Sequence, residues 1–191
     1  MAMTATLYTT ECVWGSSSFN STTDLKVGRT SSDTYYKGRV KFAAIPANWV
    51  IQSITLRLKR IDSYTTHTLL FGGSTGTGFS ASLSFSFNQS ISSGAGTKSI
   101  DLTPYASIIQ GFGATWYIHV RHGSGSNSYS EFNGDEDSTS AKPQLVITYV
   151  LGTVWYSNAG TWVECEVWYC NAGTWLKVIP YYNSGGTWVQ V

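Results

Sequence analysis

Residues 53–61 read SITLRLKRI, and the alternation in this stretch is the clearest indication of the fold. Apolar side chains occupy every second position, and polar side chains occupy the positions between them. The apolar positions are Ile54, Leu56 and Leu58, and the polar positions are Thr55, Arg57 and Lys59. Successive side chains of an extended chain point to opposite sides, so this stretch predicts a strand with one face in a core and the other in water.

The same alternation extends along the chain on both sides of this strand. Residues 82–88, SLSFSFN, place Leu83, Phe85 and Phe87 opposite three serines. Comparable patterns, separated by turn clusters such as FGGSTGTG and SSGAG, predict strands near 5–13, 24–27, 38–44, 66–71, 98–101, 116–121 and 144–150. Many short strands at this spacing predict an all-β fold, a jelly-roll β-sandwich over residues 1–150.

One helical turn is predicted at 101–110, DLTPYASIIQ. Thr103 is suited to cap its start, and Pro104 is suited to its first position.

The composition limits the class of partner. The chain has 191 residues, with 12 Lys and Arg against 11 Asp and Glu, so its net charge does not favour nucleic acid. Only 12% of the residues are charged, whereas Ser, Thr, Gly and aromatic residues are abundant. This profile is typical of extracellular or virion proteins whose strands are covered by hydroxyl groups. We therefore expect the protein to be located in a virion or another extracellular particle.

The N-terminal sequence MAMTATLYTTECVWG has no basic stretch followed by the apolar run that directs secretion. No later stretch is apolar over the length needed to cross a bilayer. We expect synthesis in the host cytoplasm without a signal peptide, and no membrane insertion. The three cysteines, Cys12, Cys165 and Cys170, lack a metal-type spacing and do not predict a disulfide framework.

Four segments resemble, in order, the landmarks of DNRLRE-type β-sandwich domains. They are STTDLKVGR (21–29), GRVKFAAIPANWVIQSITLRL (38–58), SIDLTPYASIIQG (99–111) and SEFNGDEDSTSAKPQLVITY (130–149). The shared features are a Leu-x-Val-Gly strand, an apolar strand ending in Ile-Pro, an Asp-Leu-Thr helix start and a closing Pro-x-Leu-x-Ile-x-Tyr strand. The resemblance covers about residues 5–149. It implies a non-catalytic jelly-roll module of surface proteins, polysaccharide enzymes and phage particles, and it implies no particular ligand.

Residues 151–191 contain a 13-residue phrase three times, with tryptophan at 162, 175 and 188. Each copy predicts a β-hairpin with a four-residue loop, in which Gly160, Gly173 or Gly186 supplies a positive φ. With loops of that length, each hairpin carries one directly opposed aromatic pair on one face and a tyrosine on the other. The pairs are Trp155 with Trp162, Trp168 with Trp175, and Tyr181 with Trp188, and the tyrosines are Tyr156, Tyr169 and Tyr182.

These aromatic residues have two interpretations. A lone hairpin is marginally stable, so stacked aromatic pairs, each contributing about 0.5–1.5 kcal/mol beyond burial, would supply a missing core. That core would form within one chain or between copies, for example in a trimer. Alternatively, some rings stay exposed as platforms for sugar rings. The candidate ligand-binding or assembly residues are therefore Trp155, Trp162, Trp168, Trp175, Tyr181 and Trp188.

The phrases NAGTW and GGTW also resemble short repeats near the ends of bacteriophage tail, baseplate and fibre proteins. This resemblance implies a structural or attachment component of a phage or phage-like particle. Its expected partners are other virion proteins, copies of itself and cell-surface polysaccharide. The alternative is a carbohydrate-binding module of a secreted bacterial enzyme or adhesin.

The histidines do not predict a catalytic or metal site. In TWYIHVRHG (115–123), strand parity separates His119 from His122, and we expect these residues and His67 to face solvent or lie in turns. No Ser-His-Asp or Cys-His site is predicted.

The acidic residues are expected to be ordinary surface charges. Glu164 and Glu166 share one face of a strand at about 6–7 Å, where two carboxylates cannot flank a scissile bond. Residues 135–137 form an acidic turn that lacks the spacing of a calcium loop, although calcium binding there stays open. We predict a non-enzymatic protein with no catalytic residues, no metal site and no cofactor.

Overall fold

A computed structural model describes most of the chain. Backbone and side chains are described for residues 2–19, 24–29, 34–62, 65–123, 129–135 and 141–150. The backbone alone is described for residues 124, 151, 154–158, 161–165, 168–171, 174–177, 181–184 and 187–190.

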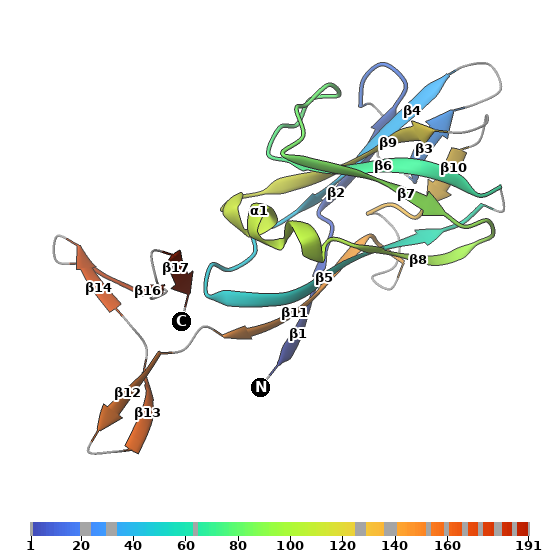
Figure 1. The fold of residues 1–191 in the computed structure, drawn as a ribbon. Helices are drawn as coiled ribbons and strands as arrows, with labels where there is room; N and C mark the ends of the chain where they lie inside the picture. The colour runs from blue at the N-terminus through green and yellow to red at the C-terminus, as the bar shows by residue number, and fades with distance from the viewer. Residues whose placement is uncertain are drawn as a thin grey trace.

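Among the described residues, eleven strands form one continuous antiparallel pairing network (Figure 1). They are β1 (Met3–Tyr8), β2 (Glu11–Gly15), β3 (Leu25–Arg29), β4 (Tyr35–Phe42), β5 (Trp49–Arg60), β6 (His67–Ser74), β7 (Phe85–Ile91), β8 (Gly96–Asp101), β9 (Trp116–Ser124), β10 (Tyr129–Phe132) and β11 (Gln144–Leu151).

The network folds into two layers. One layer has the order β1–β11–β5–β10–β3, with β8 on the other edge of β5. The other layer contains β2–β4–β9–β6–β7. β3 joins the layers, because it also pairs with the start of β4 through Gly28–Tyr36 and Arg29–Tyr35. Neighbours far apart in sequence, such as β5 and β11, give the crossed connections of a sandwich, so the predicted all-β sandwich is confirmed.

The core lies between the layers and is built from alternate strand positions. Ile54, Leu56 and Leu58 are fully buried, whereas Arg57 and Lys59 on the same strand are exposed. The prediction from residues 53–61 is therefore confirmed. The largest fully buried apolar side chains are Trp116, Phe42, Phe71 and Phe132.

The predicted single strand at 5–13 is wrong, because the chain changes layers within it. β1 ends at Tyr8 and pairs with β11, whereas β2 begins at Glu11 and pairs with β4. Thr9 is buried at the corner, and its Oγ1 lies 2.7 Å from the carbonyl oxygen of Glu11 and 2.9 Å from that of Lys41. The hydroxyl thus supplies hydrogen bonding where strand pairing is interrupted.

The helical segment consists of a 3₁₀ turn, η1 (Thr103–Tyr105), followed by α1 (Ala106–Gly111). The predicted cap is wrong, because the Thr103 hydroxyl accepts a hydrogen bond from the Ile54 N–H of β5 at 3.1 Å. Asp101 Oδ1 accepts from the Thr103 N–H at 2.9 Å instead. Thr103 therefore fastens the turn to β5. Within the described residues, neither helix has the length and apolar character to span a membrane.

Three separate two-stranded sheets follow β11, as predicted (Figure 1). They pair β12 (Val154–Asn158) with β13 (Thr161–Cys165), β14 (Trp168–Asn171) with β15 (Thr174–Lys177), and β16 (Tyr181–Ser184) with β17 (Thr187–Gln190).

The predicted loop length in these hairpins is wrong. Pairing continues to Asn158–Thr161, Asn171–Thr174 and Ser184–Thr187, so two residues separate the last paired positions where four were predicted. Two-residue connections match the twist of paired strands. The glycines assigned to the loops lie outside the described residues.

This shorter connection changes the partners of the aromatic residues. Trp155 pairs with Glu164, Trp168 with Lys177 and Tyr181 with Gln190, while Trp162, Trp175 and Trp188 pair with Ser157, Cys170 and Asn183. The two aromatic positions of each hairpin still share a face, but they are diagonal neighbours, about 7–8 Å apart, and not direct partners.

Candidate functional site

The outer face of the layer containing β5 presents a row of polar and aromatic residues across four strands. The register pairs Tyr8 with Gln144, Gln144 with Arg57, and Arg57 with Ser99. Directly paired residues of antiparallel strands share a face, so all four lie on this side of the sheet. Tyr8 is 41% exposed, and Arg57 and Ser99 are also exposed. We call this surface the open face.

The rest of the open face is rich in hydroxyl groups. The same register places hydroxyl-bearing residues from all four strands around the row, namely Thr4, Thr6, Thr148, Ser53, Thr55 and Thr97. The face therefore offers donors and acceptors at short intervals beside one exposed aromatic ring.

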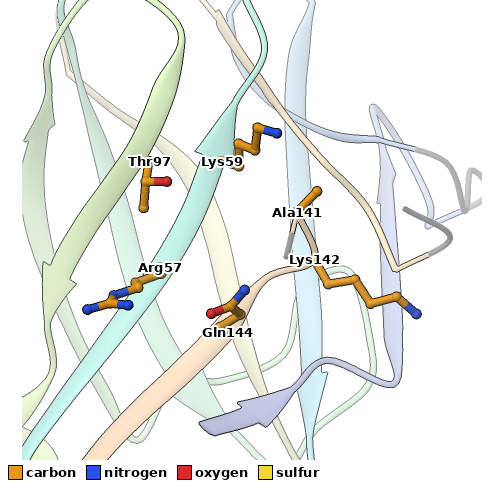
Figure 2. A pocket seen from close by; sticks show the side chains of 6 residues that line it. All are labelled: Arg57, Lys59, Thr97, Ala141, Lys142 and Gln144. Carbon is orange, nitrogen blue, oxygen red and sulfur yellow. The ribbon is translucent and has the colours of Figure 1, made fainter. Parts of the chain in front are cut away.

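A hollow of about 120 Å³ lies on the open face where β5 changes partners (Figure 2). β11 begins at Gln144, opposite Arg57, whereas β10 ends at Phe132, opposite Arg60. The edge of β5 between these points faces the connection from β10 to β11. The hollow is lined by Arg57, Lys59, Thr97, Ala141, Lys142 and Gln144.

Three cations line this hollow. In Figure 2, Arg57 and Gln144 lie side by side on neighbouring strands, and Lys142 extends to the opposite side from the Arg57 guanidinium. Arg57 and Lys59 are two residues apart on one strand, which corresponds to about 6–7 Å. Within the described part of the chain, none of the three cations forms an ion pair.

Asp101 is a carboxylate on the same face of β8, two positions from Ser99. Hydrogen bonds from the Thr103 hydroxyl and backbone N–H lower the pKa of Asp101. The Asp101 carboxylate therefore interacts with the start of η1, whereas the cations around the hollow face solvent.

A second hollow, of about 190 Å³, adjoins the first one. Its lining is mainly hydroxyl and amide groups, and it consists of Gln89, Ser90, Ile91, Ser92, Thr97, Lys98 and Ser99. Thr97 lines both hollows, so β8 forms the ridge between them. Together they form a polar depression along one edge of the open face.

The structure does not place the six aromatic residues predicted as candidates in this site. Trp155, Trp162, Trp168, Trp175, Tyr181 and Trp188 lie on the three hairpins, two to each. Their side chains are outside what the structure describes. The sequence did not reveal the open face, because its residues come from segments as far apart as positions 8 and 144. The alternation in residues 3–8 does, however, indicate that Tyr8 is exposed.

The expectation that the histidines face solvent or lie in turns is wrong for His67 and His119. Both are buried, with 5% and 1% of their surface exposed. His119 Nε2 donates to the Gly76 carbonyl at 3.1 Å, because the segment after β6 folds over this part of β9. Strand parity placed His119 on the outer face but could not show that a loop covers it.

A serine and a histidine do meet in the interior. Ser130 Oγ lies 3.3 Å from His67 Nε2, and His67 Nδ1 lies 3.1 Å from the Thr65 carbonyl oxygen, to which it donates. Burial and the nearby Arg60 lower the pKa of His67. Ser130 lies on β10 and His67 begins β6, and both side chains are buried, so this pair supports packing between the two strands.

Residues 72–76, GGSTG, have the Gly-x-Ser-x-Gly spelling of a nucleophile elbow. Ser74 ends β6 in an antiparallel sheet, whereas an elbow serine sits on a turn from a strand to a helix. The Ser74 hydroxyl is buried and accepts a hydrogen bond from the Gly76 N–H at 2.9 Å. The residue therefore stabilises the loop.

Of the acidic candidates, the structure describes residues 135 and 164 only. Asp135 Oδ1 accepts a hydrogen bond from the Cys12 N–H at 3.0 Å, which accounts for its position. Glu164 pairs with Trp155 across the first hairpin. Residues 136, 137 and 166 lie outside the described residues, and the described ones contain no cluster of three metal-ligating side chains.

Comparison with known proteins adds no relative. No protein-family model matches the chain, and no curated protein matches it significantly. The resemblances to DNRLRE-type domains and to phage repeats stay predictions from the motifs that carry them.

Proposed function

We propose that this protein is a non-enzymatic structural and attachment component of a bacteriophage or phage-like particle. In this proposal the open face contacts a glycan on the host surface, and the three hairpins hold the protein to copies of itself or to other particle proteins. The observation that carries the glycan contact is the row formed by Tyr8, Gln144, Arg57 and Ser99.

The chemistry of this row is suited to sugars. The C–H face of a sugar ring is apolar and packs on an aromatic ring, for which the exposed Tyr8 provides a platform. Sugar hydroxyls need closely spaced donors and acceptors, which the amide of Gln144, the guanidinium of Arg57 and the hydroxyl of Ser99 provide.

The hairpins support the assembly role. Each one is a separate two-stranded sheet with two aromatic positions on one face. A two-stranded sheet of this size is marginally stable in water without another surface to cover its apolar side. Neighbouring hairpins or other copies of the chain provide such a surface.

Affinity electrophoresis of the full chain in gels containing neutral or acidic polysaccharides tests the glycan contact. We expect retardation by at least one polymer, and we expect Tyr8→Ala to weaken it. Tyr35→Ala is the matched control, because Tyr35 is 45% exposed and lies on β4, away from the open face. Absence of retardation by every polymer would remove the glycan contact from the proposal.

Light scattering of the full chain tests the assembly role. We expect an oligomer, for example a trimer, that dissociates when Trp162, Trp175 and Trp188 are all replaced by serine. The matched control makes the same replacement by serine at Tyr156, Tyr169 and Tyr182, which lie on the opposite face of the same hairpins, and it should leave the oligomer intact. A monomer whose retardation on polysaccharide is lost in Trp162→Ala and Trp175→Ala would instead favour a carbohydrate-binding module of a secreted enzyme or adhesin.

A further inference from the structure

The outer face of the second layer carries another concentration of basic residues. β4 places Lys37, Arg39 and Lys41 at alternate positions, and β9 places His119 and Arg121 beside them. Arg39 pairs directly with His119. The last paired residues of β4 and β9 at this end are Gly38 and Val120. Lys37 and Arg121 adjoin that pair and therefore lie opposite each other on the two strands.

A single carboxylate neutralises only part of this group. Glu11 lies 2.6 Å from Arg39 Nη2 and 3.8 Å from Lys41 Nζ. In the described chain, neither Lys37 nor Arg121 forms an ion pair. These two cations are therefore left facing each other, which is unfavourable for like charges on adjacent strands.

The surroundings make this arrangement more costly than it would be in water. Burial and the charge of Arg121 lower the pKa of Lys37, and burial lowers the pKa of Arg121. Lys37 Nζ lies 4.3 Å from the centre of the Phe79 ring, and this cation–π contact offsets part of the repulsion but supplies no negative charge. The repulsion between the two cations is stronger in this half-buried position than it would be in water.

One N–H group of Arg121 also lacks a hydrogen-bond acceptor among the described residues. Its Nη2 donates to the Ala81 carbonyl at 3.0 Å. Its Nε–H is buried and has no hydrogen-bond partner among the described residues. A buried N–H without an acceptor is uncommon, so the guanidinium of Arg121 retains unused hydrogen-bonding capacity.

We infer that Lys37 and Arg121 bind a tetrahedral oxyanion such as phosphate or sulfate. A dianion between them would neutralise both cations and accept hydrogen bonds from Lys37 Nζ and the guanidinium group of Arg121. A monocarboxylate carries only one charge and would bind more weakly. The site lies on the layer opposite the open face and does not depend on the glycan contact.

Thermal unfolding of the full chain at neutral pH and constant ionic strength tests this inference. Increasing concentrations of inorganic phosphate or sulfate replace chloride, with acetate as the carboxylate comparison. We expect a saturable rise in Tm with phosphate and sulfate, and little change with acetate. A phosphate monoester, glycerol phosphate, shows whether the site also accepts a phosphate group attached to a larger molecule.

Lys37→Gln should abolish the rise in Tm. Because it removes like-charge repulsion, it should leave the protein without added anion at least as stable as wild type, which a purely structural lysine would not do. The matched control is Lys41→Gln, on the same face of β4 but paired with Glu11, and it should keep the full rise. The inference would be overturned if Lys37→Gln and wild type showed the same rise in Tm, or if chloride raised Tm as much as phosphate and sulfate do. Lys37→Met repeats the test with a second side chain.

Discussion

His119 is held neutral in the outer face of β9. Burial lowers its pKa to about 4, and the charges of Arg121 and Arg39 act in the same direction, against the opposing effect of the hydrogen bond to the Gly76 carbonyl. The rings of Phe19 and Tyr117 lie at 6.2 and 6.4 Å from the imidazole. Protonation of the folded protein therefore adds a positive charge beside Arg121 and Arg39 in a buried position, where solvent screening is weak.

We predict that the protein loses stability as the pH falls from about 6.5 to about 4. Below about pH 6.5, the ordinary pKa of histidine, His119 binds a proton in the unfolded chain but not in the folded protein. Proton binding then favours the unfolded chain, so the contribution of neutral His119 to stability is complete above about pH 6.5 and decreases below it. The loss from this residue is at most about 3 kcal/mol. Urea unfolding at both ends of this pH range measures it.

His119→Gln is the comparison variant, because glutamine does not titrate and can still donate to Gly76. The variant should lose less stability than wild type over the same pH range. His67, whose pKa is also lowered, contributes equally to both proteins. Identical pH dependence in both would contradict the prediction.

β4 crosses from one layer to the other, because its start pairs with β3 and the rest pairs with β2 and β9, and Gly38 makes this crossing possible. A Cβ at Gly38 would overlap Leu25 Cδ1 and lie 3.0 Å from Val27 Cγ1. Leu25 and Val27 are fully buried, so neither side chain can move aside into solvent. The close approach of these two strands thus depends on the absence of a side chain at one position.

Gly38→Ala is predicted to reduce the free energy of unfolding by about 1–3 kcal/mol, because it overpacks a filled core. Chemical denaturation measures the change. Gly78→Ala is the matched control, since a Cβ there meets nothing within 4 Å, and it should change stability by less than about 0.5 kcal/mol. Similar losses in the two variants would show that the contact with Leu25 is not the cause.

The two layers are tied together at one end by a buried ion pair. Arg60 is fully buried at the end of β5, and its Nε donates to Asp62 Oδ1 at 2.9 Å. Arg60 Nη1 also donates to the carbonyl of Ser92, just after β7, at 2.7 Å. Asp62 Oδ2 accepts from the Glu131 N–H of β10 at 2.5 Å. This cluster therefore connects strand ends from both layers.

Arg60→Met is predicted to destabilise the protein by about 3–5 kcal/mol, because it leaves the Asp62 carboxylate buried without its counter-charge. Arg57→Met, three residues earlier on the same strand, provides the control. Arg57 is exposed and forms no ion pair in the described chain, so its replacement should change stability by about 0.5 kcal/mol or less. If both variants unfold at the same denaturant concentration, the ion pair does not have this role.

Much of the architecture could be predicted from local pattern. Alternation depends on neighbouring residues alone, so it correctly assigned the buried and exposed sides of residues 53–61 and the all-β class. The repeated phrase correctly predicted three hairpins. The strand β10 was not predicted, because one of its two buried positions is a serine, Ser130, so the segment shows no alternation of apolar and polar residues.

Long-range contacts account for what the pattern did not reveal. Arg60 continues the buried positions after Leu58, yet its burial depends on Asp62 and on a carbonyl 32 residues away. Likewise, burial of His119 depends on the loop that carries Gly76. A side chain's alternation sets which way it points, but only the surrounding segments set whether water reaches it.

The amino-acid order alone was sufficient for the all-β class, for the core-facing side of clearly alternating strands such as residues 53–61, and for the existence of the repeats, because these properties arise within a few consecutive residues. The open face and the facing pair Lys37 and Arg121 required the folded chain. Both depend on the register between strands separated by tens to more than a hundred residues, and register is set by how the whole core packs.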